Sequence, residues 1–276
     1  MGYFMEHDRW HQALFCHFKV CADLVQSLLP VGLKVDVAPD GNCYIGLVLL
    51  TEKGVGPGQP IRSVTSVLSF VPPFSHVDHY GANVRVYVRD ANGNNPGIYF
   101  FSLECNSRKA TFGANVFGIP YVFAKMSRTL DYSLKAQRDL ALHTMVSERT
   151  SMLPSLFNVA EGAGDDDVGV LSCQWQVDVT SAGSSNDAQR RASGGGENGD
   201  VWNDLARFFV ERYRVYAVSQ IGLLSGTVEH HPWPVQPAEV EKKFSHADVV
   251  KYLRPSQNSR SKHYLFQRFR PSTMFV

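Results

Sequence analysis

The sequence has 276 residues with a formal net charge of +1, and it consists of 44% apolar, 19% charged and 12% aromatic residues. This length is sufficient for a full hydrophobic core, and the high aromatic content favours sheets over helix bundles. The near-neutral charge gives no reason to expect nucleic-acid binding, because nucleic-acid-binding proteins concentrate Lys and Arg in patches.

The cysteines and the hydropathy pattern indicate the compartment. The five cysteines contain no C-x-x-C pair, which is typical of reduced and mostly buried thiols. The first residues lack the apolar stretch of a signal peptide, and no run reaches the roughly 18 apolar residues of a membrane span. We therefore expect a cytoplasmic protein without a membrane partner.

The first third of the chain alternates between extended runs and turns. Residues 17–30 begin as a strand and continue as a short helix that ends at Pro30. Residues 35–37 and 43–50 form a predicted strand pair around a turn, and residues 51–60, rich in Gly and Pro, form a predicted loop. This loop lacks the Lys-Ser/Thr of a phosphate-binding loop, so phosphate binding is not expected there.

The run NVRVYVR at residues 83–89 alternates strictly between polar and apolar side chains. A strand of this kind presents three valines on one face and Arg85 and Tyr87 on the other. Residues 98–105 are apolar on both sides and form the predicted returning strand, at the centre of a sheet. Glu104 stands near the end of this strand.

The remaining elements are again mostly extended. Strands are predicted at residues 108–115, 117–126, 130–138, 141–148, 171–179 and 263–269, and short helices at residues 202–211 and 238–244. Strands outnumber helices and no βαβ alternation occurs. The predicted fold is therefore mainly β (α+β), an antiparallel sheet in a single domain that covers residues 1–276.

Residues 181–200 consist mostly of Ser, Gly, Asn and Asp and contain no large apolar side chain. Such a segment cannot bury enough surface to offset the entropy lost on ordering, so we predict a disordered surface insertion. The sequence Arg-Arg-Ala-Ser that ends at Ser193 resembles the pattern of basophilic protein kinases. Ser193 is either a phosphorylation site or part of a solvated loop without a regulatory role.

Several stretches carry a family resemblance: residues 24–35, 83–88, 97–104, 120–126, 211–216 and 230–239. Together they resemble the YqjF-like proteins of unknown function, in the acetoacetate-decarboxylase-like superfamily. The resemblance implies a β-barrel with a few short helices and a small-molecule ligand in its interior.

Two departures from the family pattern bear on chemistry. In the decarboxylases a Schiff-base lysine directly follows a proline, whereas the residue after Pro120 is Tyr121. Imine catalysis needs an amine with a lowered pKa, and the nearest one is Lys125. Relatives also often carry a glutamate two residues before Asn83, where this chain has Gly81. The resemblance therefore implies a ligand site without imine chemistry.

The candidate ligand-binding residues are Arg85, Tyr87, Glu104, Tyr121, Tyr213 and His230. Arg85 either clamps a carboxylate with its planar guanidinium or pairs with an acid on a neighbouring strand. Glu104 either acts as a general base or is the buried partner of an arginine such as Arg85 or Arg212.

Residues 213–230 read as a β-hairpin with a two-residue turn at Ile221-Gly222. This register places Arg214 on the outer face and brings Tyr213 and His230 together at the rim of the interior. There they either meet a ligand or only close the end of the barrel.

No metal and no cofactor are expected. His76, His79, His230 and His231 are of the right type to bind zinc, but nothing in the sequence brings the two groups together. Three functions remain: an enzyme that acts on a small carboxylate or carbonyl compound, a non-catalytic binding or carrier barrel, and an interaction protein with a filled barrel. A ligand-sized cavity would exclude the third. The sequence leaves open whether the protein is a homo-oligomer.

Overall fold

The fold is given by a computed structural model, which describes residues 5–6, 9–57, 77–116, 119, 121–135, 138–149, 170–178, 197–219, 222–228, 233, 235, 239–242 and 271–275. The helices are α1 (Ala22–Gln26), α3 (Arg108–Val116) and α5 (Glu197–Val210). The first strands are β1 (Met5–Glu6), β2 (Arg9–Val20), β3 (Leu33–Val35), β4 (Cys43–Pro57), β5 (Val77–Asp90) and β6 (Gly97–Cys105). The others are β7 (Tyr121–Lys135), β8 (Arg138–Arg149), β9 (Val170–Asp178), β10 (Arg214–Ser219), β11 (Gly222–Thr227), β12 (Glu239–Lys242) and β13 (Pro271–Phe275).

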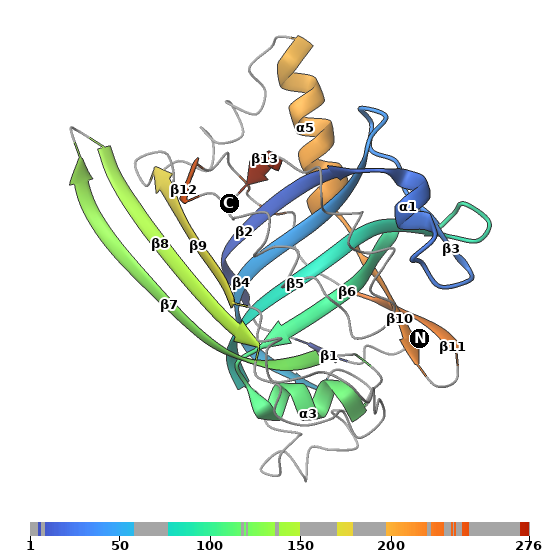
Figure 1. The fold of residues 1–276 in the computed structure, drawn as a ribbon, viewed down its shortest axis with the longest axis horizontal. Helices are drawn as coiled ribbons and strands as arrows, with labels where there is room; N and C mark the ends of the chain where they lie inside the picture. Colours follow the sequence, from blue (N-terminus) through green and yellow to red (C-terminus); the bar gives the residue numbers. More distant parts are fainter. Residues whose placement is uncertain are drawn as a thin grey trace.

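The strands form one large sheet in the order β12-β9-β8-β7-β6-β5-β4-β2-β13. Figure 1 shows β2, β4, β5 and β6 side by side at the centre, with the long strands β7 and β8 extending to one side. A mainly β fold with few helices is therefore confirmed. β12 and β13 stand at opposite ends of the order and do not pair, so the described strands do not by themselves close into a barrel.

The predicted antiparallel sheet has two parallel pairings, both of them at β6. Most neighbours are antiparallel, including the predicted pair β5 and β6, but both β7 and β10 pair with β6 in parallel. β3 also pairs with β5 instead of β4, because β2 and β5 occupy the two edges of β4. The turns between consecutive strands carry no information about pairings of this kind, so the sequence does not predict them.

The alternation of β5 is confirmed and divides the central strands into two faces. The Val84 face carries Val84, Val86 and Val88 and packs against Val25 of α1 and Tyr216 of β10. The Arg85 face carries Asn83, Arg85 and Tyr87 and packs against Ala206, Phe209 and Val210 of α5. Both faces are buried, so the polar face of β5 is enclosed by a helix rather than exposed to water.

Two predicted elements have the other secondary structure. Residues 108–115 form α3 instead of a strand, because Ala110 and Ala114, four residues apart, are both buried while Phe112 is exposed. Within the predicted helix at residues 238–244, Glu239–Lys242 is strand β12, which pairs with β9. The predicted loop at residues 51–60 is also too long, since β4 continues to Pro57.

The segment before α5 begins the helix earlier than predicted. α5 starts at Glu197, inside the range 181–200, so the last four residues of that range are helical. Residues 181–196, with Ser193, lie outside the described part of the chain, as does the predicted strand at residues 263–269. Within the part of the chain that the structure covers, no helix is long and apolar enough to span a membrane.

Candidate functional site

Arg85 and Tyr87 lie beneath the last turn of α5. Tyr87 is fully buried, and its hydroxyl oxygen is 2.7 Å from Nε2 of His17. Arg85 donates from Nη2 to the backbone oxygen of Phe209 at 3.1 Å, and its Cζ is 5.2 Å from the centre of the Phe15 ring. Burial and then the charge of Arg85 hold the pKa of His17 well below its usual value. Arg85 therefore points into the core, where it binds a helix carbonyl.

The end of α5 is fixed to the sheet by a second arginine. Arg212 donates from Nη1 to Asp36 at 2.6 Å and from Nε to the backbone oxygen of Phe208 at 2.6 Å. The other oxygen of Asp36 accepts a 2.6 Å hydrogen bond from Arg89. Carbonyl groups at the end of a helix have no partner within the helix, so Arg85 and Arg212 supply the missing donors. The helix end thus covers the Arg85 face in a fixed position.

A second cluster of polar side chains, Glu52 and His79, lies on the same face, on the side of Gly81 away from Arg85. Glu52 is not among the residues predicted from the sequence. Glu52 lies opposite His79 in the β4–β5 register, and its Oε1 is 3.8 Å from Nε2 of His79. The side chain of Glu52 is 11% exposed and that of His79 is fully buried. A Cβ atom built on Gly81 would be 3.3 Å from Oε1 of Glu52, so this carboxyl group lies in the space above the glycine.

The position of Glu52 relates to one of the sequence departures. Relatives often carry a glutamate where this chain has Gly81, and the structure places a carboxyl group above Gly81 from the neighbouring strand. A signal for Glu52 was present, because residues 44, 46, 48, 50 and 52 share one face of an alternating strand. This alternating pattern was not recognised, because Gly54, Gly56 and Pro57 give the stretch the composition of a loop.

Burial shifts the ionisation of Glu52 and His79 in opposite directions. It raises the pKa of Glu52 to about 7, although a hydrogen bond from Trp10 opposes the shift. It lowers the pKa of His79 to about 4, although the charge of Asp78 opposes this shift. Near pH 7 the histidine is therefore neutral, and the carboxyl group is divided between its acid and its ionised form.

Three side chains on the Arg85 face have buried polar atoms without a hydrogen-bond partner among the described residues. The atoms are the two ring nitrogens of His79, Oδ1 of Asn83 and Nε of Arg85. Each of these residues is at least nine-tenths buried. Buried polar groups are nearly always paired in folded proteins, so four such atoms along one strand face call for an explanation.

Glu104 lies on the other face of the sheet. It is opposite Ala82, which belongs to the core of the Val84 face, and its Oε1 accepts a 3.0 Å hydrogen bond from Ser102. Directly opposite residues of antiparallel strands point the same way, so Glu104 and Arg85 are on opposite sides of the sheet. The alternative in which Glu104 pairs with Arg85 is therefore wrong, and Arg212 binds Asp36.

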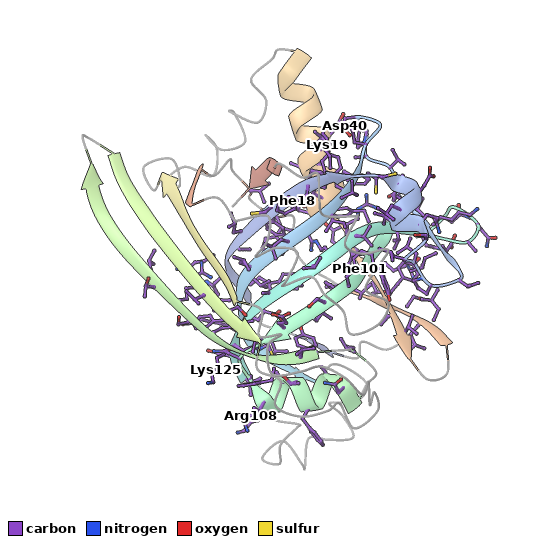
Figure 2. All side chains as sticks on the ribbon, in the orientation of Figure 1. Phe18, Lys19, Asp40, Phe101, Arg108 and Lys125 are labelled. Atoms are coloured by element: carbon purple, nitrogen blue, oxygen red, sulfur yellow. The ribbon has the colours of Figure 1, made fainter. Side chains whose placement is uncertain are left out.

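Tyr121 lies at the start of β7, beside Glu52 and His79. Its ring centre is 6.3 Å from that of His79, and burial, followed by the charges of Glu52 and Cys105, raises its pKa well above the usual value. Lys125 is exposed, and Figure 2 shows it at the lower rim of the molecule with Arg108. The residue next to the buried acid is thus a phenol, and the nearest amine along the strand is in solvent.

The C-terminal hairpin differs from its prediction by two residues. Arg214 lies opposite Thr227 and Ser219 opposite Gly222, so Gln220 and Ile221 separate the paired residues. A shift of two does not change which side chains share a face. The prediction of which face is buried is wrong, however, because Tyr216, which shares the predicted outer face with Arg214, lies in the core. Tyr213 is 39% exposed and donates a hydrogen bond to Glu211, so it does not line an interior. His230 lies outside the described residues.

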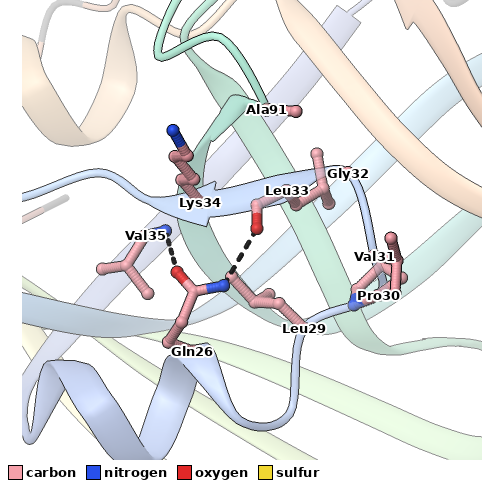
Figure 3. A pocket seen from close by; sticks show the side chains of 9 residues that line it. All are labelled: Gln26, Leu29, Pro30, Val31, Gly32, Leu33, Lys34, Val35 and Ala91. Carbon is pink, nitrogen blue, oxygen red and sulfur yellow. Dashed lines mark hydrogen bonds between the residues drawn. The ribbon is translucent and has the colours of Figure 1, made fainter.

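A pocket of about 670 Å³ opens at another place, between α1 and β3. Figure 3 shows Gln26 at its base, bonded to the backbone oxygen of Leu33 and the backbone nitrogen of Val35, each at 2.9 Å. The other lining side chains are mostly aliphatic, with Lys34 the charged exception. This pocket contains none of the six predicted site residues, and neither Glu52 nor His79 is part of it.

The described residues also contain no group of three or more His, Cys, Asp or Glu side chains that could hold a metal ion. The Arg85 face carries four buried polar side chains: an acid, a neutral imidazole, an amide and a guanidinium. Such an arrangement can bind a small polar compound and exchange a proton with it.

Comparison with known proteins gives the family. DUF2071, a family of uncharacterized conserved proteins, matches residues 7–266, and the chain therefore belongs to this family. The uncharacterized protein YqjF of Bacillus subtilis (strain 168) is 24% identical over 242 residues, which are 87% of this chain and 78% of YqjF. The resemblance to YqjF-like proteins is thus confirmed.

Solved structures with similarity come from the acetoacetate-decarboxylase-like group. The enduracididine biosynthesis enzyme MppR is 10% identical with a TM-score of 0.34 and is aligned over 63% of this chain and 69% of its own. An acetoacetate-decarboxylase-like enzyme from Sphingomonas wittichii RW1 is 10% identical with a TM-score of 0.32, over 64% and 71% of the chains. Acetoacetate decarboxylase from Legionella pneumophila is 12% identical with a TM-score of 0.32, over 64% and 66%. This likeness is too distant to assign a site.

Proposed function

We propose that this protein binds a small carbonyl or carboxylic compound on the Arg85 face, beside Glu52, and that it does so without forming an imine. The observation that carries the proposal is the set of buried, unpartnered polar atoms on His79, Asn83 and Arg85. Leaving a buried polar atom without a hydrogen bond costs about 1–3 kcal/mol, and a ligand that supplied the missing partners would recover this energy.

The spacing of these side chains suits a small molecule. Alternate residues of a strand are about 7 Å apart, so His79 and Asn83 are separated by about 13 Å along β5. The carboxyl group of Glu52 lies between them, above Gly81. A compound of a few heavy atoms placed next to Glu52 would come within reach of both neighbours.

The chemistry of the unpartnered atoms favours a carbonyl or carboxylic group. A neutral imidazole offers one N–H donor, and Nε of Arg85, about 20 Å away along β5, is a second donor that only a longer compound would reach. Oδ1 of Asn83 is an acceptor, which suits a hydroxyl group or a protonated acid. A carboxylate or carbonyl oxygen accepts from such donors, whereas a cation would meet them unfavourably.

The absence of an imine follows from the residues around Glu52. Tyr121 stands where the decarboxylases carry their lysine, and Lys125 is exposed. The proposal includes the barrel that the family resemblance implies, with the Arg85 face as its interior, and a cytoplasmic location. A carrier that only binds the compound is the second candidate. It is favoured because Arg85 is bound to the Phe209 carbonyl and Tyr87 is packed against α5, so neither is free to act on a ligand.

Native mass spectrometry of the purified protein tests the binding. The expected result is an additional mass that disappears on denaturation, and saturable ligand-observed NMR signals with pyruvate or acetoacetate. Replacing Asn83 with Ala should weaken this binding, whereas Asp204→Asn, which changes an exposed carboxylate on α5, should not. A protein that carries no ligand and binds none of these acids would exclude the proposal.

A further inference from the structure

We infer that Glu52 and His79 catalyse proton transfer at the carbon atom next to a carbonyl group, so that the protein enolises the compound that it binds. This inference rests on the proposed function, since it needs a carbonyl compound beside Glu52. It adds a reaction class and two catalytic residues, neither of which is among the six candidates from the sequence.

The geometry brings together the two groups that enolisation requires. One is a base that can take a proton from carbon, and the other is a hydrogen-bond donor for the oxygen that becomes negative. Oε1 of Glu52 and Nε2 of His79 are 3.8 Å apart, which is too long for a direct hydrogen bond. Both ring nitrogens of His79 lack a partner among the described residues, so its N–H is available to a bound oxygen.

The environment fixes the position of both groups. Glu52 receives a hydrogen bond from Trp10 on β2 and lies above Gly81, where a Cβ atom would make a tight 3.3 Å contact with its Oε1. His79 is held on β5 with its side chain fully buried and its ring against Tyr121. A base and a donor on two paired strands are positioned more precisely than groups on loops.

The ionisation of the pair agrees with these roles. The pKa of Glu52 is raised to about 7, which makes its carboxylate a stronger base than an exposed glutamate. The pKa of His79 is lowered to about 4, so the donor is a neutral imidazole that does not neutralise the base. Among the described residues, the other titratable groups that face Glu52 are Cys105 on β6 and Tyr121 on β7, and burial raises the pKa of both.

The step is balanced without a cofactor. The C–H bond next to the carbonyl breaks, and its proton passes to the carboxylate of Glu52. The electron pair of that bond forms a C=C bond, and the π pair of the carbonyl moves onto oxygen, which accepts the hydrogen bond from His79. Return of a proton from Glu52 restores the carbonyl compound. When the proton of Glu52 exchanges with D₂O in between, the compound gains deuterium.

Deuterium exchange in D₂O tests the inference, with pyruvate and acetoacetate as probes and NMR as the readout. Because both exchange slowly in buffer, the quantity compared is the rate above the protein-free rate. The expected result is faster exchange with the protein, at a rate that rises as Glu52 ionises near pH 7. Glu52→Gln should lower the added rate by about 100-fold or more, while Asp204→Asn should not change it.

Two further measurements separate loss of the base from loss of the fold. Glu52→Asp keeps a carboxyl group and should retain part of the added rate, and near-UV circular dichroism reports packing in each variant. Binding without added exchange, or exchange that survives Glu52→Gln in a folded protein, would overturn the inference and leave the proposed binding intact. Absence of both binding and exchange would overturn the proposed function as well.

Discussion

Gly97 lies so close to Arg214 that a Cβ atom at position 97 would be 2.7 Å from the Arg214 backbone oxygen. Gly97 begins β6 at the point where β10 pairs with it in parallel, with Val215 opposite Ile98. The missing side chain therefore permits a contact between strands that are more than 100 residues apart in the sequence.

Replacing Gly97 with Ala should lower the free energy of unfolding by about 1–3 kcal/mol, because β10 must move away from β6. Gly226→Ala is the matched control, since β11 has open space at that Cβ position. The control should be neutral or slightly stabilising. Urea unfolding of both variants measures the difference, and equal effects would mean that the close contact does not constrain β10.

Arg212 and Arg89 both bind Asp36 at 2.6 Å but differ in exposure, with side chains 6% and 41% exposed. Arg212→Gln should cost about 3 kcal/mol of stability, because it leaves a buried carboxylate with a weaker partner and frees the carbonyl of Phe208. Arg89→Gln should cost less than about 1 kcal/mol, as for exposed ion pairs. Chemical denaturation measures the free energy of unfolding of the two variants, which should differ clearly. A larger effect of Arg89→Gln would contradict the conclusion that Arg212 holds the end of α5 on the sheet.

Glu52 and His79 should make opposite contributions to stability between pH 4.5 and pH 6.5. The folded pKa of Glu52, about 7, exceeds its unfolded value of 4.5, so its contribution is fully present below pH 4.5 and is lost as the pH rises to about 7. The folded pKa of His79, about 4, is below its unfolded value of 6.5. Its contribution is therefore present above pH 6.5 and is lost as the pH falls to about 4.

Glu52→Gln removes only the first of these contributions, each of which is at most about 3 kcal/mol. Relative to the wild type, the variant should gain stability as the pH rises from 4.5 to 7. The difference in the free energy of unfolding between the two proteins, measured with urea at each pH, cancels the effects of other groups. A difference that does not change with pH would show that Glu52 is ionised normally in the folded protein.

Incubation with acetoacetate and borohydride should leave no stable adduct, because an imine needs a buried amine beside the ligand. The position after Pro120 is Tyr121, and Lys125 is exposed on β7. Mass spectrometry of the reduced protein gives the measurement. An added mass that maps to Lys125, and that Lys125→Arg abolishes, would restore imine chemistry.

Gln26 should stabilise β3 by covering its free edge. The side-chain amide donates to the oxygen of Leu33 and accepts from the nitrogen of Val35, as a neighbouring strand would. Gln26→Ala should cost about 1 kcal/mol. Gln26→Glu should cost more at pH 7 than at pH 4, because only the protonated acid can donate to Leu33. Thermal unfolding at both pH values checks this, and a pH-independent cost would contradict it.

Local patterns predicted the fold well where partners are close in the sequence. The alternation of residues 83–89 and the polar turn after them predicted β5, β6 and the separation of Val84 from Arg85. In the β10–β11 hairpin, Gly222 does have the positive φ that was expected, +117°, but it is the first residue of β11 rather than a turn residue. Composition alone does not distinguish these positions, which differ by two residues in register.

The candidate site was less predictable because it depends on pairing between distant strands. Glu52 and His79 meet through the β4–β5 register, and Tyr121 reaches them only because β7 pairs in parallel with β6. Short-range periodicity contains no information about such a parallel neighbour. Glu104 illustrates the same limit. A β-bulge between Phe100 and Ser102 places its side chain on the Val84 face, and the sequence gives no sign of this bulge.

The pairing of β13 with β2 has a consequence for synthesis on the ribosome. Phe15 and Cys16 are opposite Phe275 and Met274, so the edge of β2 obtains its partner only after residues 271–275 have been made. Until then β2 has exposed backbone donors and acceptors along an apolar strand, which is a template for pairing with other chains. A nascent chain of this protein therefore carries this edge of β2 without its β13 partner for most of its translation.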